Sequence, residues 1–268
     1  MSVAHTNGAA LRFDIIDLVP PWIANPQTIL FHHGLGMIRQ SWNAWLPALI
    51  GRFRIVTFDT RGHGESTWEN PDSPLTLEDF RTDLLAVANA AGLDRFHVVG
   101  ESLGGTIGLL LGITVPERLH SLTICNAAHR GEKIQATDHF RDYLAREGMA
   151  AWSASMMPGR FHIAPETATL RSWYERVQAS IAPQTVLGIR DALVGADISD
   201  RAGDIRTPCL LMNGDSSPFI APDMTADLHA RLADSEMAIL PKARHGLPVS
   251  HGPACAAILR DYLDRRFP

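Results

Sequence analysis

One short motif limits what this chain can fold into: Gly100-Glu101-Ser102-Leu103-Gly104, a G-x-S-x-G pentapeptide. It follows the apolar, β-branched run 95–100 and precedes a stretch rich in glycine, leucine and isoleucine that continues to Pro116. This order indicates a strand, a tight turn and a helix, with the serine at the turn. Glycines on both sides allow the turn without a Cβ clash, so the hydroxyl stands exposed beside a helix N-terminus.

A serine at such a turn has two interpretations. In the first, the serine caps the following helix: its side chain accepts hydrogen bonds from the first free amides of that helix. Alternatively it is a nucleophile, and then it needs a base that removes the hydroxyl proton. The pentapeptide leaves both interpretations open, and the partners available elsewhere in the chain decide between them.

Strand and helix patterns alternate on both sides of this motif. We predict strands over residues 11–18, 28–33, 53–58, 97–99, 119–126, 207–213 and 236–240. Helices are predicted over 42–50, 76–91, from Ser102 onward, 224–232 and 253–267, with Thr76 as an N-cap. Strands separated by helices of this length form βαβ units. The chain is therefore expected to be an α/β protein with a mostly parallel sheet flanked by helices.

The stretch 127–203 shows no strand pattern. It contains the helical segments 139–152 and 167–180, and prolines interrupt it at Pro158, Pro165 and Pro183. We interpret it as a helical cap inserted after one strand of the sheet. The chain then divides into a core domain, formed by 1–126 and 204–268, and a cap subdomain over 127–203. A length of 268 residues is sufficient for such an arrangement.

Composition excludes several classes of function. The net charge of −5 and the scattered basic residues leave no electrostatic footprint for nucleic acid. No apolar run reaches the length of a membrane span, and no secretory leader is visible, so we expect a cytoplasmic protein. The three cysteines are too widely spaced for a disulfide framework. The sequence allows a homo-oligomer but does not require one.

The base expected for Ser102 is His245. It lies in the loop Pro241–Gly246, between the last predicted strand and the terminal helix. That loop leaves the same carboxyl edge of the sheet as the serine turn, where parallel α/β proteins collect their active sites. The alternative interpretation of His245 is a solvated loop histidine.

An anionic intermediate at such a serine needs two backbone amides directed at one point. The amide of Leu103 follows the serine, and that of Leu35 lies in the glycine-rich loop His33-Gly34-Leu35-Gly36. A second glycine-rich turn, residues 58–66, is expected to be structural, with Asp59 and Arg61 bracing the loops. The adjacent histidines 32 and 33 point to opposite faces of a strand, so no metal site and no cofactor are expected.

These motifs, in their order and spacing, resemble the α/β-hydrolase fold family over nearly the whole chain. Within that family the chain is most similar to the 3-oxoadipate enol-lactonase group. The stretches that carry this second resemblance are Phe-Asp-Thr-Arg-Gly-His-Gly-Glu-Ser (58–66), Cys-Asn-Ala-Ala-His-Arg (125–130) and Arg-Glu-Gly-Met-Ala-Ala (146–151). The resemblance implies a Ser-His-acid triad on this fold.

The chain departs from the family pattern at the acid. The family places it three residues after a glycine that ends a strand, and here that position is Ser217. Asp215 lies two residues earlier, and we predict that its carboxylate hydrogen-bonds to His245. Ser217 acting through water, or Asn126 at the alternative acid position after the strand before the cap, are the other candidates. Asp223 is expected to cap the next helix.

We therefore expect a serine hydrolase that cleaves a small carboxylic ester or lactone through an acyl-enzyme. The substrate is a small molecule. A substrate carboxylate is expected to bind Arg130, and Trp152 is a second candidate for substrate binding. Further candidates for the pocket lining in the cap are Met156, Met157, Arg160, Phe161 and Trp173. Alternatives on the same fold are a carbon–carbon bond hydrolase, a perhydrolase and a cofactor-free dioxygenase. An alternative of another class is a ligand receptor built on a hydrolase scaffold.

Overall fold

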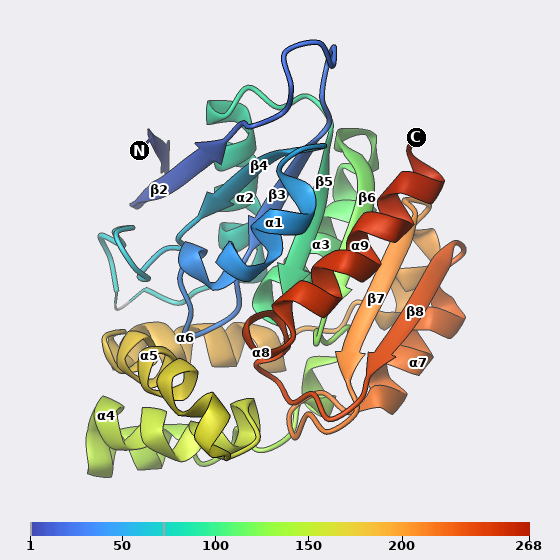
Figure 1. Cartoon of the computed structure of the whole chain (residues 1–268). Coiled ribbons are helices and arrows are strands. Elements are labelled where there is room, and N and C mark those ends of the chain that lie inside the picture. Colours follow the sequence, from blue (N-terminus) through green and yellow to red (C-terminus); the bar gives the residue numbers. More distant parts are fainter. Residues whose placement is uncertain (1, 72) are drawn as a thin grey trace.

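An eight-stranded sheet forms the centre of the computed structural model, which describes residues 2–71 and 73–268 (Figure 1). The strand order is β1-β2-β4-β3-β5-β6-β7-β8. β1 (Ser2–Thr6) and β2 (Ala9–Ile16) pair antiparallel, as do β2 and β4 (Arg54–Phe58), and the other neighbours are parallel. The remaining strands are β3 (Thr28–His32), β5 (Phe96–Glu101), β6 (Leu119–Cys125), β7 (Cys209–Gly214) and β8 (Ser235–Leu240). The predicted α/β class, with a mostly parallel sheet, is confirmed.

The central strands are mostly apolar because both of their faces are covered. Every residue of β3, β5 and β7 is buried. Successive side chains alternate between two apolar clusters: Leu30 and Val98 belong to one, Phe31 and Val99 to the other. A strand buried on both faces reads as a continuous hydrophobic run, which explains why these strands were found from the sequence.

Helices pack on both faces of the sheet (Figure 1). One apolar cluster takes side chains from α2 (Leu77–Ala90), α3 (Leu103–Thr114) and α7 (Pro222–Arg231). The other takes them from α1 (Leu46–Leu49), α8 (Leu247–Ser250) and α9 (Gly252–Arg266). Thr76 caps α2 as predicted, in a reciprocal capping box with Asp79. Short 3-10 turns lie at Arg39–Trp45, Pro116–Arg118, Gly131–Lys133, Pro165–Thr167 and Ser199–Asp204.

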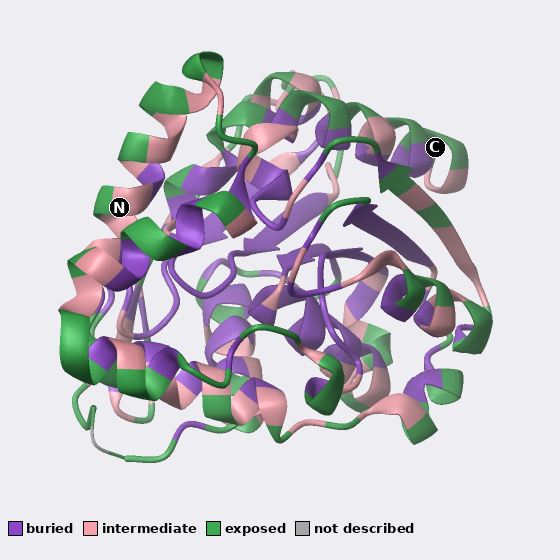
Figure 2. Ribbon diagram, turned by 90° about the horizontal axis from the view of Figure 1, so that it is seen from below, coloured by how far each residue is buried: buried purple, intermediate pink, exposed green. Residues whose placement is uncertain are grey.

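Three helices lie between β6 and β7, together below the sheet in Figure 1: α4 (Phe140–Arg160), α5 (Ala168–Ala179) and α6 (Pro183–Val194). In Figure 2 their outer surfaces are exposed and the buried residues lie inside. The division into core and cap at the stated boundaries stays a prediction. The sequence analysis missed α6 because it took Pro183 for a break, whereas a proline fits the first turn of a helix. α4 changes direction at Gly148, where φ is 77°.

A buried arginine joins three segments near the carboxyl ends of β3 and β4. The side chain of Arg39 is 4% exposed and pairs with Asp14 on β2 and with Asp59 and Glu65 in the loop after β4. Its backbone amide also donates to Asp59 Oδ1 at 2.7 Å. Arg61 in the same loop donates to both carboxylate oxygens of Asp83, at 2.6 and 2.7 Å. These contacts confirm that Asp59 and Arg61 brace the loops.

None of the helices in the described part of the chain is long and apolar enough to cross a membrane.

Replacing Arg39 by Met is expected to lower the free energy of unfolding by about 3–5 kcal/mol, because it leaves the buried Asp59 carboxylate without its charge partner. Urea denaturation followed by circular dichroism measures this. The control is Arg141→Met, which removes an exposed pair with Asp191 and is expected to cost less than about 1 kcal/mol. Equal losses in the two variants would contradict the bracing role of Arg39.

Candidate active site

Ser102 stands at the sharp turn between β5 and α3. Its backbone has φ 53° and ψ −112°, a strained conformation for a residue with a side chain. Two hydrogen bonds hold the turn: Ser102 N–H donates to the Cys125 carbonyl at 2.9 Å, and Thr106 N–H donates to the Ser102 carbonyl at 3.0 Å. A Cβ on Gly100 would lie 2.2 Å from the Gly104 carbonyl oxygen, so no other residue fits there. The strand–turn–helix predicted from the pentapeptide is present.

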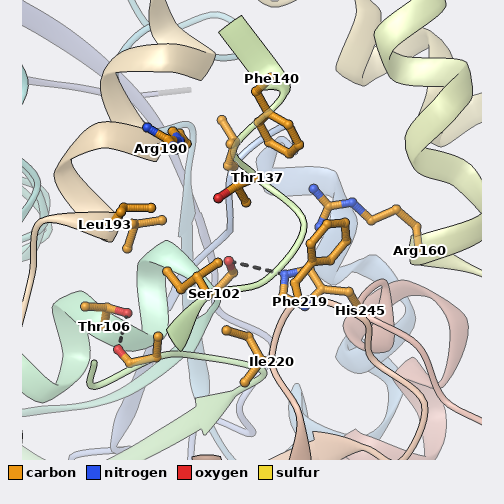
Figure 3. A pocket seen from close by; sticks show the side chains of 14 residues that line it. Ser102, Thr106, Thr137, Phe140, Arg160, Arg190, Leu193, Phe219, Ile220 and His245 are labelled. Carbon is orange, nitrogen blue, oxygen red and sulfur yellow. Dashed lines mark hydrogen bonds between the residues drawn. The ribbon is translucent and has the colours of Figure 1, made fainter. Parts of the chain in front are cut away.

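The Ser102 side chain lies in a pocket between the sheet edge and the helices α4 and α6. Most of the lining residues are apolar: Leu35, Ala128, Ile134, Phe140, Leu193, Val194, Phe219 and Ile220. Polar groups are few, with Ser102, Thr106, Thr137, Arg160, Arg190 and His245 among the lining residues (Figure 3). A concave apolar pocket with a few convergent polar groups is typical of a small-molecule site.

His245 lies in the loop after β8, and its Nε2 is 3.4 Å from the Ser102 hydroxyl oxygen (Figure 3). The Phe219 ring packs edge-on against the imidazole, with the ring centroids 5.0 Å apart. Burial, together with the nearby Arg160 cation, holds the pKa of His245 well below its usual value of 6.5. The imidazole is therefore neutral at physiological pH and able to accept a proton.

The other ring nitrogen of His245 faces Ser217 rather than Asp215. The distance from Nδ1 to the Ser217 hydroxyl oxygen is 3.1 Å, and Ile220 N–H donates to the same oxygen at 3.3 Å. The predicted hydrogen bond from Asp215 is wrong. Asp215 still belongs to the edge of the sheet, because its N–H donates to the Leu240 carbonyl. The chain turns toward His245 only after Asp215, and the Asp215 carboxylate is exposed.

Asn126, at the end of β6, contacts the backbone of His245 and not its ring. Its Nδ2 donates to the His245 carbonyl at 3.0 Å, and its Oδ1 accepts from Gly214 N–H at 3.0 Å. The side chain amide thus connects the end of β7 to the His245 loop. The alternative in which Asn126 orients the imidazole is not supported by these contacts.

Two neutral histidines hold the loop that carries Leu35. His33 Nε2 accepts from Thr60 N–H at 3.0 Å, so its Nδ1–H donates to the Gly34 carbonyl at 2.9 Å. His63 Nε2 accepts from Gly36 N–H at 3.3 Å, and burial lowers the pKa of His63 to about 4. Leu35 lines the pocket, and Leu103 begins α3 directly after the serine. That their amides bind an oxyanion stays a prediction.

Arg130 and Trp152 are not among the residues that line the Ser102 pocket. Arg130 donates to Glu132 at 2.9 Å and borders a separate surface pocket with Lys133. Trp152 is fully buried, edge-on to the Phe140 ring at a centroid distance of 5.1 Å. Both expectations were wrong because position along the chain does not tell which side of the cap a side chain faces.

Arg160, at the end of α4, is the buried cation of the pocket. It is 5% exposed, and its guanidinium carbon lies 5.2 Å from the Phe219 ring centroid and 5.8 Å from that of Tyr174 (Figure 3). Among the described residues, its Nε has no hydrogen-bond partner, and no carboxylate lies within ion-pair distance. A buried cation without an ion pair is costly, so the pocket favours an anion at this point.

Glu101, the residue before the serine, is the functional candidate that the sequence analysis missed. Its carboxyl group is buried, and Oε1 lies 3.7 Å from Nε2 of His245. Burial raises the pKa of Glu101 to about 7, while the Arg160 cation and a hydrogen bond with the Gly34 backbone act in the opposite direction. The available signal was an acidic residue at the last position of an otherwise apolar, buried strand.

Comparison with known proteins agrees with this geometry. Residues 27–156 match the family model described as alpha/beta hydrolase fold. The chain has the α/β-hydrolase fold, and it is a hydrolase.

Similar relatives and structures are known from bacteria. A putative carbamate hydrolase RutD of Caulobacter segnis is 28% identical over 235 residues, 85% of this chain and 88% of that protein. The 3-oxoadipate enol-lactonase 1 of Acinetobacter baylyi is 28% identical over 209 residues, 72% of this chain and 73% of that protein. The crystal structure of the enol-lactonase from Burkholderia xenovorans LB400 has a TM-score of 0.87 and 24% identity, and covers 98% of this chain and 100% of that one. These relatives agree with the resemblance read from the motifs.

The finding that Ser217, and not Asp215, contacts the His245 ring can be tested directly. Asp215→Asn is expected to leave kcat for 4-nitrophenyl butyrate within about twofold of wild type, because the carboxylate is exposed and turned to Ser216. Ser217→Ala is expected to lower kcat roughly threefold to tenfold through the lost hydrogen bond to Nδ1. A large loss in Asp215→Asn alone would contradict the geometry.

Proposed function

We propose that this protein is a serine hydrolase that cleaves a small carboxylic ester or lactone whose acyl part also carries a free carboxylate. The observation that carries the proposal is the approach of the Ser102 hydroxyl to within 3.4 Å of a neutral, buried His245 inside an apolar pocket. A serine on a strained turn, facing a base, has the arrangement of an activated nucleophile.

The reaction follows from the positions of these groups. The Ser102 oxygen attacks the substrate carbonyl carbon while Nε2 of His245 takes its proton. The amides of Leu35 and Leu103 donate to the oxyanion of the tetrahedral intermediate. When the intermediate collapses, His245 returns the proton to the departing alcohol or enol oxygen, and the acyl group stays on Ser102. A water molecule, deprotonated by His245, then releases the acid and restores the serine.

Arg160 supports the assignment of an anionic substrate. Its guanidinium borders the same pocket as Ser102 and has no carboxylate partner among the described residues. Arg190 also lines the pocket, but its side chain is already paired with Asp138 and Asp191. A substrate carboxylate at Arg160 gains two charge-assisted hydrogen bonds, which also set the distance between the anion and the scissile carbonyl. Of the two relatives named above, one is called an enol-lactonase and the other a putative carbamate hydrolase.

The cytoplasm is the compartment that we assign to this activity. Cys125, Cys209 and Cys255 are buried and free, and a protein of this size with reduced thiols is typical of a reducing compartment.

Removing the nucleophile tests the covalent mechanism. Ser102→Ala is expected to lower kcat for 4-nitrophenyl butyrate by about 10⁴-fold or more, as in other enzymes that use a serine–histidine pair. A fluorophosphonate should label wild type at Ser102, as read by peptide mass spectrometry, and should not label the variant. A Ser102→Ala protein that keeps half of the wild-type turnover would overturn the mechanism.

A matched pair of substrates tests the anion site. Arg160→Met is expected to raise KM for 4-nitrophenyl hemisuccinate by roughly tenfold to a hundredfold, the value of a lost charge-assisted contact, and to change KM for neutral 4-nitrophenyl butyrate much less. Arg130→Met, which alters a half-buried arginine outside the pocket, is the control and should leave both constants near wild type. Equal effects of Arg160→Met on the two esters would assign Arg160 to the packing of the cap.

A further inference from the structure

Within residues 2–71 and 73–268, no carboxylate bonds to Nδ1 of His245, the base of this site. In Ser-His-Asp hydrolases the acid has two roles: it orients the imidazole in one tautomer, and its negative charge stabilises the imidazolium that forms during attack. Ser217 occupies the acid's place, at 3.1 Å from Nδ1. A hydroxyl orients the ring through a hydrogen bond, but it is neutral and supplies no charge. The second role therefore needs another residue.

Glu101 approaches the other ring nitrogen of His245. Its Oε1 is 3.7 Å from Nε2, and this oxygen is buried without a hydrogen-bond partner among the described residues. Its other oxygen is close to the loop that carries Leu35, since a Cβ on Gly34 would lie 2.0 Å from Oε2. The carboxyl group is thus held between that loop and His245. Burying a carboxylate costs free energy unless an opposite charge lies beside it. The positive charge nearest to the Glu101 carboxylate is that of the His245 imidazolium, which forms only during the reaction.

We propose that the two roles of the missing acid are divided: Ser217 orients the His245 ring, and the Glu101 carboxylate stabilises the imidazolium. This inference rests on the proposed function. When the Ser102 oxygen bonds to the substrate carbon, its proton moves to Nε2, and the resulting N–H⁺ faces Oε1. The proton then leaves with the alcohol, and Glu101 remains ionised throughout. It is a positioning residue that acts through His245.

The charges around Glu101 define how this should depend on pH. The groups that face its carboxyl group from neighbouring elements are those of His245, Arg160, Tyr174, Cys125 and His33. Burial raises the pKa of Tyr174 to about 12 and that of the Cys125 thiol well above its usual value, so both stay neutral. Burial lowers the pKa of His33 well below 6.5, and Arg160 stays cationic.

Glu101 is therefore the group in this cluster that changes charge near neutral pH. Its pKa of about 7 means that it is ionised above that pH and neutral below it. The stabilisation of the imidazolium is present above pH 7 and is lost as the pH falls. The pKa of His245 is held well below 6.5, so its own protonation comes at lower pH.

The test measures kcat/KM for neutral 4-nitrophenyl butyrate from pH 5 to 9 in wild type, Glu101→Gln and Glu101→Asp. Wild type should lose activity as the pH falls through about 7. Glu101→Gln should be roughly tenfold to a hundredfold slower at pH 8, since an opposite charge at this distance shifts the pKa of an imidazole by about one to three units. This variant should also lack the acid limb, which is the decrease in kcat/KM as the pH falls through about 7. Glu101→Asp keeps a carboxylate and should keep the limb. Glu132→Gln, at an exposed glutamate, is the matched control.

Testing Glu101→Gln in a second background, the Ser217→Asp variant, separates this role from a structural one. Ser217→Asp places a carboxylate at Nδ1, where it supplies the charge in the usual way. In that background Glu101→Gln should cost less than about threefold, and Ser217→Asp alone should weaken the limb near pH 7. The same loss in both backgrounds would assign Glu101 to the packing of the turn. If Glu101→Gln does not fold, as judged by circular dichroism, the limb in Ser217→Asp alone decides.

The outcomes distinguish this inference from the function on which it rests. If wild type hydrolyses neither ester and a fluorophosphonate does not label Ser102, the proposed function is wrong. If wild type is active and labelled, and Glu101→Gln retains its rate and its acid limb, the function stands and the division of roles is wrong.

Discussion

The close approach of backbone segments around Ser102 is the constraint on which the rest of the site depends. Gly100 and Gly104 allow β5, α3 and the end of β3 to lie so near that a Cβ on Gly104 would be 2.1 Å from the His32 carbonyl oxygen. This contact holds the serine in its strained conformation and places the loop of Gly34 directly against it. Strain at one residue is tolerated because the surrounding sheet over-determines its position.

The helices between β6 and β7 contact the His245 loop through two backbone hydrogen bonds. His245 N–H donates to the Gly159 carbonyl at 3.2 Å, and Gly246 N–H donates to the Arg160 carbonyl at 2.9 Å. The end of α4 therefore holds the base in place and carries the cation of the pocket. A movement of α4 would displace both together, which couples the position of a bound anion to that of the base.

Three buried ionisable groups, Arg160, Glu101 and His245, lie close enough at this site to interact. Arg160 favours the charged form of Glu101 and disfavours that of His245, and burial disfavours both charged forms. A neutral base and a carboxyl group that titrates near neutrality follow from this balance. An anion bound at Arg160 would offset its charge and so make His245 more basic when substrate is present. Opposed pKa shifts of this kind are typical of catalytic sites.

The sequence by itself determined the class of the fold, the serine turn and the histidine that meets it, because each depends on local or periodic patterns: a buried strand, glycines beside Ser102, and a histidine after the last strand. The tertiary structure decided which side chains meet. Asp215 and Ser217 differ by two positions in one loop, yet the Asp215 carboxylate accepts from the Ser216 hydroxyl, and Ser217 contacts the His245 ring. Likewise Arg160 rather than Arg130 faces the pocket, and Glu101 reaches His245, because three-dimensional packing, unlike periodicity, sets the direction of a single side chain.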